Sequence, residues 1–114
     1  MKLRLAILLS LAACASLALA SSRSQRARGA AVFEVSGCRH CHTIHNVGGH
    51  KGPDLSDVGK RIHKAALRQQ IVHGSKVMPA FEEVLAPDEI NDLIAYLHSC
   101  REKPAKAATV ASSN

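Results

Sequence analysis

Aromatic side chains are scarce in this chain of 114 residues, which has no tryptophan, one tyrosine and two phenylalanines. A small domain builds only a thin hydrophobic core, and it commonly depends on a disulfide, a metal or a cofactor for stability. A shortage of large aromatic residues makes the core thinner still. The composition therefore predicts that more than side-chain packing holds the folded part together.

Two further absences narrow the fold class and the partners. No segment of useful length alternates apolar and polar residues, as strands with one buried face do, so we expect an all-α chain. A large charge excess is also missing, because 15 Lys and Arg residues stand against 9 Asp and Glu residues. Such a mild basic balance does not indicate a nucleic-acid-binding protein.

Residues 1–20 have the composition of an export signal. Lys2 and Arg4 precede an apolar run over residues 5–19, and a small-x-small cleavage site ends at Ala20. A permanent membrane anchor is the alternative. A spanning helix needs roughly 20 apolar residues, whereas serines interrupt this shorter run. We therefore expect cleavage after Ala20 and a periplasmic or otherwise exported protein.

A second processing route involves Cys14. Leu11-Ala12-Ala13-Cys14 resembles a bacterial lipobox, in which the cysteine becomes the acylated first residue of a lipoprotein. The apolar run continues past Cys14, which favours the later cleavage. Lipidation of Cys14 would instead make the protein a membrane-anchored lipoprotein, associated peripherally with the membrane.

Cys38-Arg39-His40-Cys41-His42 has the Cys-x-x-Cys-His spacing of a covalent attachment site for c-type haem. Two thiols three positions apart can add to two vinyl groups on one porphyrin edge, and the following histidine can bind the iron. Taken alone, a Cys-x-x-Cys pair also suits a thioredoxin-like redox site or half of a zinc site. The export signal favours haem, because bacterial haem attachment takes place outside the cytoplasmic membrane.

The rest of the chain divides into a leader, a folded part and a tail. Residues 21–28 are polar and basic without apolar periodicity, so we expect a flexible leader. Residues 102–114 have the small, polar, proline-interrupted composition of a disordered tail. The predicted domain therefore covers residues 29–101.

Within this domain, residues 30–35 are expected to form a short helix that leads into the cysteine motif. The Gly- and Pro-rich stretch 43–55 is expected to be an extended loop. Apolar spacing predicts a helix over residues 64–72, which Gly74 ends. The clearest helix covers residues 87–97, with proline in its first turn and apolar residues at helical spacing.

Met78 is the candidate for a second axial ligand on the iron. Apart from Met1 it is the only methionine, and it lies in Val77-Met78-Pro79, outside the predicted helices. A methionine that only fills an apolar gap is the alternative. The remaining histidines are expected to be solvent-facing or capping residues: His40, His45, His50, His63, His73 and His98.

In this order and spacing, the motifs resemble those of small bacterial monohaem class I cytochromes c with His and Met ligands. The resemblance covers residues 29–100 and rests on the cysteine motif, Gly52-Pro53-Asp54-Leu55, Val77-Met78-Pro79 and the last helix. It implies a single all-α cytochrome c-type domain of about three to four helices wrapped around one covalently bound haem c and its iron.

The resemblance also implies a role for each matched residue. Cys38 and Cys41 would hold the haem through thioether bonds, and His42 and Met78 would be the axial iron ligands. The backbone carbonyl of Pro53 would accept a hydrogen bond from the Nδ1–H group of His42 and so fix its tautomer.

The resemblance also implies that Gly29 and Phe33 of the first helix would pack against Tyr96 of the last helix, where the two helices cross. Cys100 does not belong to the pattern. We expect it to be a small buried residue at the end of the last helix, and the alternative is an exposed thiol that forms an intermolecular disulfide.

These residues predict electron transfer by Fe(II)/Fe(III) cycling and no enzymatic activity. Iron with His and Met ligands has no open position for a substrate, and methionine raises the reduction potential. The alternatives are a haem enzyme or gas-binding sensor with a labile sixth ligand, and an electron-delivering subunit of a dehydrogenase or oxidase complex. The expected partners are redox proteins, with four candidate docking lysines: Lys51, Lys60, Lys64 and Lys76.

Overall fold

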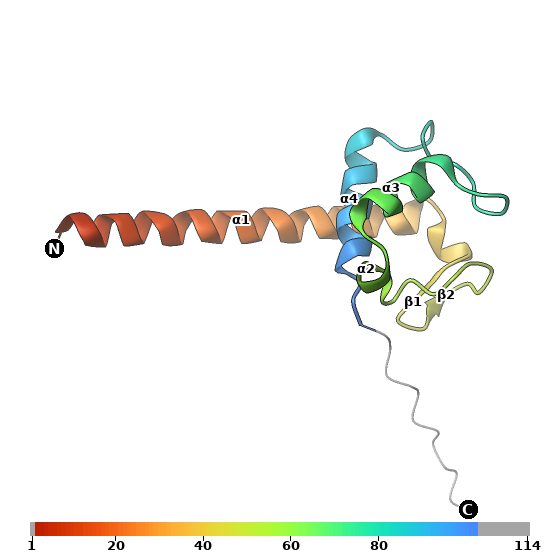
Figure 1. The fold of residues 1–114 in the computed structure, drawn as a ribbon, viewed down its shortest axis with the longest axis horizontal. Coiled ribbons are helices and arrows are strands. Elements are labelled where there is room, and N and C mark those ends of the chain that lie inside the picture. The colour runs from red at the N-terminus through yellow and green to blue at the C-terminus, as the bar shows by residue number, and fades with distance from the viewer. Residues whose placement is uncertain (1, 103–114) are drawn as a thin grey trace, which may run out of the picture.

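The computed structural model describes residues 2–102, so the predicted tail lies outside the described residues except for residue 102. Helices dominate, and they confirm the all-α class (Figure 1). In chain order the elements are α1 (Lys2–Val35), the 3-10 helix η1 (Cys38–His40), β1 (Thr43–Ile44), β2 (Val47–Gly48), α2 (Val58–Arg61), α3 (Lys64–His73) and α4 (Pro87–Ser99).

Helix α1 is one continuous helix of 34 residues, where the sequence predicted a signal, a flexible leader and a short helix. Residues 21–28 are helical because alanine, arginine and glutamine favour the helix and because Arg28 is tied to the domain. Its guanidinium donates to the Ser24 hydroxyl at 2.9 Å and to the Asp92 carboxylate at 2.7 Å. The described side chains between residues 3 and 24 are exposed, so the first part of α1 extends away from the domain (Figure 1).

The apolar part of α1 passes one test for a membrane span. Its segment Ala6–Val35 is long and apolar enough to cross a bilayer, and none of its most apolar stretch is buried within the protein. A signal sequence near the N-terminus has the same properties. This helix is therefore compatible with either a cleaved signal or a retained anchor.

The second part of α1 crosses α4 at very short range. A Cβ atom added to Gly29 would lie 2.0 Å from the carbonyl oxygen of Asp92 and 2.7 Å from the Cβ of Tyr96. One turn further along α1, the ring of Phe33 meets that of Tyr96 edge-on, with 5.9 Å between the ring centroids. The predicted meeting of the first and last helices is therefore confirmed.

The hydrophobic core lies between α1, α3 and α4, and its most deeply buried large side chains are Phe33 and Leu93. Cys100 is buried in this core, as predicted. Its carbonyl accepts a hydrogen bond of 2.8 Å from the N–H group of Gly59, which attaches α2 to the end of α4. The buried apolar residues are Val32, Phe33, Ile44, Val58, Leu67, Ile71, Leu85, Ile90, Leu93, Ile94, Leu97 and Cys100.

The two later helices follow their sequence signals closely. Helix α4 begins at Pro87, as predicted, and the side chain of Glu89 accepts a hydrogen bond from the N–H group of Ala86 at 2.9 Å. Helix α3 ends one residue later than predicted, at His73, and Gly74 follows with a positive φ of 64°. Local signals therefore mark the start of α4 and the end of α3.

The stretch after the cysteine motif is more ordered than the extended loop that we predicted. Strands β1 and β2 pair antiparallel, with Thr43 opposite Gly48 and Ile44 opposite Val47. The two residues between them, His45 and Asn46, both have positive φ, at 51° and 64°. Such a two-residue turn matches the right-handed twist of a hairpin, so the chain reverses directly after the motif.

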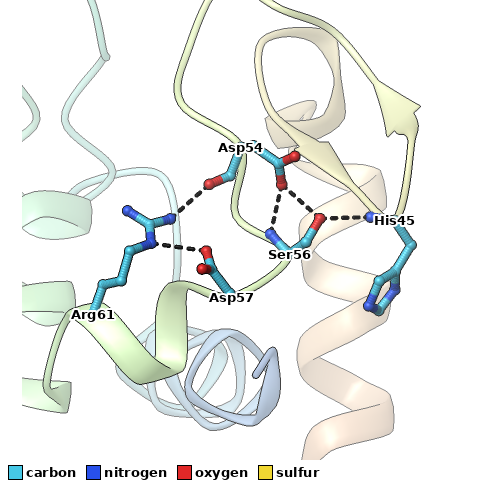
Figure 2. A network of polar contacts seen from close by, with 5 residues as sticks. All are labelled: His45, Asp54, Ser56, Asp57 and Arg61. Carbon is cyan, nitrogen blue, oxygen red and sulfur yellow. Dashed lines mark hydrogen bonds and ion pairs between the residues drawn. The ribbon is translucent and has the colours of Figure 1, made fainter. Parts of the chain in front are cut away.

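A polar network then fixes this hairpin to the segment before α2 (Figure 2). The hydroxyl of Ser56, which is fully buried, donates to the Asp54 carboxylate at 2.5 Å and accepts from the N–H group of His45 at 2.8 Å. Arg61 donates to the Asp54 carbonyl at 2.7 Å and to the Asp57 carboxylate at 2.8 Å. These hydrogen bonds therefore fix the loop that leads into α2.

Candidate haem site

The cysteine motif forms a tight turn directly after α1. Gly37 ends the helix with a φ of 76°, in the left-handed region that favours glycine. The N–H groups of Cys41 and His42 then donate to the carbonyl of Cys38 at 3.2 and 3.0 Å. Both cysteines are free thiols and half-buried. The turn therefore presents two thiols and an imidazole from one short segment.

Arg39, between the two cysteines, connects this turn to its surroundings. Its guanidinium donates to both carboxylate oxygens of Glu34 in α1 and to the carbonyl of Val47 in β2 at 2.7 Å. It also lies 5.4 Å from the centroid of the Phe33 ring, a cation–π distance. The ion pair lowers the pKa of Glu34 and raises that of Arg39, chiefly through the hydrogen bonds between them. Sequence reasoning missed this role of Arg39.

His42 has one ring nitrogen engaged by the protein and one that is available. Its Nδ1 lies 2.8 Å from the carbonyl oxygen of Pro53. Because a carbonyl only accepts, Nδ1 carries a proton, and in the neutral imidazole Nε2 is then the nitrogen with the free lone pair. No residue between 2 and 102 contacts that Nε2 through a hydrogen bond. The imidazole is therefore in the tautomer that binds a metal through Nε2.

Gly52 makes this arrangement possible. A Cβ atom at this position would lie 2.5 Å from Cε1 and 2.8 Å from Nδ1 of the His42 ring. The N–H group of Gly52 also donates to the carbonyl of Cys41 at 2.8 Å. The Gly52-Pro53 segment thus lies against the imidazole and is attached to the same turn, which orients the ring.

The thiols and their surroundings disfavour the other uses of a Cys-x-x-Cys pair. Burial raises the pKa of Cys38, so its thiol is neutral at pH 7 and not a reactive thiolate. Within the described part of the chain, no group of three or more His, Cys, Asp or Glu residues is arranged to hold a metal ion. The second half of a zinc site is therefore missing there.

Met78 lies in the loop between α3 and α4, half-buried, and its main chain is fixed at two points. Its N–H group donates to the Ser75 hydroxyl at 3.2 Å, and its carbonyl accepts from the Ser75 N–H group at 2.8 Å. The side-chain amide of Gln70 in α3 donates to the Met78 sulfur at 3.4 Å. Sequence reasoning did not identify Gln70, because nothing in the local pattern marks it.

The cysteine turn and the Met78 loop each contribute a partly buried side chain, Cys38 and Met78, that packs against the hydrophobic core. Figure 1 shows both at the end of the domain that lies away from the N-terminus. A set of partly buried apolar side chains packs against the core there and elsewhere: Cys38, Leu55, Ile62, Val72, Met78, Phe81 and Tyr96. Two free thiols, an imidazole with an available Nε2, a thioether and apolar surroundings together make a donor set that fits a covalently attached haem.

The other histidines lie outside this set. His98, in the last turn of α4, is half-buried, and His63 is the residue that precedes α3. The exposed histidines are His40, His45, His50, His63 and His73. Their exposure agrees with the predicted solvent-facing or capping positions.

Comparison with known families decides the identity of the domain. The family model described as cytochrome C oxidase, cbb3-type, subunit III matches residues 24–97. The chain belongs to this family. The match includes the cysteine motif, Pro53, Met78 and the crossing of α1 with α4. Searches of curated proteins and of solved structures found no match.

Membership of this family establishes the general chemistry. The domain is a cytochrome c domain, its cofactor is covalently bound haem c with iron, and it transfers electrons to and from redox partner proteins. Cytochrome c domains of this type are electron carriers. The match begins within α1, so the family domain includes part of the segment that we expected to be a flexible leader.

Proposed function

We propose that this protein is an exported electron carrier with one haem, which Cys38 and Cys41 bind covalently and His42 and Met78 ligate. The observation that carries the proposal is the 2.8 Å contact between His42 Nδ1 and the Pro53 carbonyl, because it leaves Nε2 available. When bound, the haem supplies a one-electron Fe(II)/Fe(III) couple. The chain's own residues then determine how that couple is held.

Each side chain has a defined task in this proposal. The Pro53 carbonyl keeps the proton on Nδ1 and orients the ring, while Gly52 leaves room for the imidazole. Cys38 and Cys41 would hold the haem through covalent bonds, and the apolar side chains around them would exclude water. Exclusion of water favours Fe(II), the state with the smaller charge, and so raises the reduction potential.

A carrier is favoured over a haem enzyme or a gas sensor because Met78 is held in place. Its main chain has two hydrogen bonds with Ser75, and its sulfur has a contact with Gln70. A sixth ligand that the protein restrains would leave no open position on the iron for a substrate or a gas. No observation on residues 2–102 favours the enzyme or the sensor.

The position of the carrier among its partners is a second part of the proposal. The family description names a subunit of an oxidase, which favours a role in delivering electrons to an oxidase. The lysines proposed for docking are exposed: Lys51, Lys60, Lys64 and Lys76. Exposed positive charge would accelerate encounter with an acidic redox partner, more strongly at low salt.

Absorption spectroscopy tests the ligand set. The ferric protein is expected to show the weak red band of a sulfur–iron bond, and the Met78→Ala variant is expected to lose it and to bind carbon monoxide when reduced. Val77→Ala is the matched control, because the Val77 side chain is 90% exposed. Carbon monoxide binding by the unaltered ferrous protein at neutral pH would exclude the carrier and favour the sensor.

Mass spectrometry tests the attachment. The protein, produced in a host with machinery for c-type haem, is expected to keep one haem through acid–acetone extraction. A variant with Cys38→Ser and Cys41→Ser is expected to lose it. Extraction of haem from the parent protein would contradict covalent binding by these cysteines.

Residues 1–20 are proposed to be a signal that is removed on export, which gives a mature N-terminus at Ser21. Helix α1 is equally compatible with a retained anchor. Intact-mass measurement of the exported protein separates the outcomes. A chain that begins at Met1 would establish an anchor, and an acylated chain that begins at Cys14 would establish a lipoprotein.

A further inference from the structure

The sulfur of Met78 has a polar partner on α3. The side-chain amide nitrogen of Gln70 lies 3.4 Å from this sulfur, within the range of an N–H···S hydrogen bond. Gln70 lies on α3 and is otherwise exposed to solvent. A thioether sulfur is a weak acceptor, so the contact contributes little to the stability of α3 and acts mainly on the position of the sulfur.

The main chain around Met78 is placed so that its side chain meets this helix. A Cβ atom on Gly74 would lie 2.4 Å from the Met78 carbonyl oxygen, so glycine is required where the loop folds back on the end of α3. After the loop, the N–H group of Phe81 donates to the carbonyl of Ile71 at 3.0 Å. Both sides of the loop are thus attached to the last turns of α3, close to Gln70.

With the main chain fixed, the remaining freedom of Met78 is in its side chain. An unbranched thioether has three rotatable bonds and adapts easily to irregular space. A residue that must present its sulfur to an iron in one direction therefore needs a restraint beyond its backbone. The amide of Gln70 is the one polar contact to this sulfur within residues 2–102.

We infer that Gln70 is a positioning residue for the sixth ligand. Its N–H group engages one lone pair of the Met78 sulfur, and the second lone pair would remain available to the haem iron. The inference rests on the proposed ligation by Met78. Loss of the N–H group frees the thioether to rotate away from the iron, so an added ligand displaces it more easily.

The magnitude follows from the energy of one hydrogen bond. The net contribution of a single hydrogen bond corresponds to a change in an equilibrium constant of about three- to tenfold. An exogenous ligand such as imidazole must break the sulfur–iron bond before it binds ferric iron. The affinity for imidazole is therefore expected to rise about three- to tenfold when the donor is removed.

Three variants separate the hydrogen bond from packing. Gln70→Leu removes the donor and keeps a good helix former. Gln70→Glu keeps the shape of the side chain, but an ionised carboxylate has no N–H group to donate. Gln69→Leu, at the adjacent exposed position, is the matched control. Gln70 is exposed, so we expect each variant to fold, and far-UV circular dichroism measures this directly.

The test is a titration of the ferric, haem-loaded, full-length protein with imidazole at pH 7, followed through the weak red band. Gln70→Leu and Gln70→Glu are expected to bind imidazole about three- to tenfold more tightly than the parent, while Gln69→Leu is expected to match the parent. Equal affinities for the parent and both Gln70 variants would overturn the inference. Parental affinity in Gln70→Glu alone would also overturn it, because the shape of the side chain, without an N–H donor, would then be sufficient to hold the Met78 sulfur in place.

Failure of this inference is distinguishable from failure of the proposed function. If the parent protein lacks the red band, Met78 is not the ligand, and both statements fail. If the parent shows the band, Met78→Ala removes it and the position 70 variants bind imidazole with the affinity of the parent, only the role of Gln70 fails.

Discussion

Replacement of Gly29 by alanine gives a stringent test of how α1 packs on α4. The added Cβ would lie 2.0 Å from the Asp92 carbonyl oxygen, whereas ordinary contact begins at 3.4 Å. The methyl group must therefore move by about 1.4 Å, and the opposing atom belongs to the backbone of a helix and cannot rotate away. Relief of the clash requires the two helices to separate, which opens the contact between Phe33 and Tyr96.

The expected size of the effect combines two opposing terms. Overpacking costs up to about 3 kcal/mol, and a clash with backbone belongs near the upper end of that range. Alanine gains about 1 kcal/mol over glycine through its helix propensity. The net loss is about 2 kcal/mol, which lowers the melting temperature of a domain of this size by about 8–16 °C.

Thermal unfolding of the haem-loaded protein, followed by far-UV circular dichroism, measures this loss. Ala31→Leu, at an exposed position of the same helix, is the control and is expected to change stability by no more than about 0.5 kcal/mol. The sign of the effect is decisive. Helix propensity alone predicts that Gly29→Ala is stabilising, so a variant that melts at or above the parental temperature would refute the close crossing.

Three other predictions concern single contacts. Arg28→Met should lower the melting temperature at pH 7. Because Arg28 holds the pKa of Asp92 below its usual range, the difference in melting temperature between parent and variant should persist above about pH 4 and shrink at lower pH. Thermal melts at pH 7 and pH 3 measure this. Gly52→Ala should displace the His42 ring, since the new Cβ would lie 2.5 Å from Cε1, and should increase the high-spin fraction in the ferric absorption spectrum. Ser56→Ala should cost about 1–3 kcal/mol in urea unfolding, because a backbone N–H group of the hairpin loses its acceptor; a cost no larger than that of the exposed control Ser99→Ala would contradict this.

The parts of the fold that sequence predicted are those with local signals. Helix α4 begins at Pro87 because the proline, the acidic first turn and the apolar spacing all act within a few residues. The helical state of residues 21–28 was missed because one of its two causes, the attachment of Arg28 to the domain, is not local. The hydrogen bonds between Arg28 and Asp92 join residues that are 64 positions apart in the chain.

The hairpin after the cysteine motif was missed for a different reason. Each strand has two residues, too few for any alternation to be visible. The turn residues His45 and Asn46 have positive φ, and of these only asparagine is a familiar signal for that conformation. The pairing of β1 with β2 is therefore evident only from the folded backbone.

The candidate site also has one part that the sequence predicted and one part that it did not. The cysteine motif was found through spacing, and the contact between His42 and Pro53 was expected from the resemblance to a family. The contacts of Arg39 with Glu34 and of Gln70 with Met78 were not predicted, because many surface arginines and glutamines have no such partner. Only the folded arrangement of α1 and α3 selects these two.

The backbone of α1 forms one continuous helix, but only the side chains of its second part contact the domain. The described side chains from residue 3 to residue 24 face solvent, and contact with the domain begins at Gln25 and Arg28. Removal of residues 1–20 would therefore take no packing from the domain. Natural variation before residue 24 is constrained by export or by the bilayer alone, and variation after it by folding. Tolerance to mutation should therefore change abruptly within a helix that has no break.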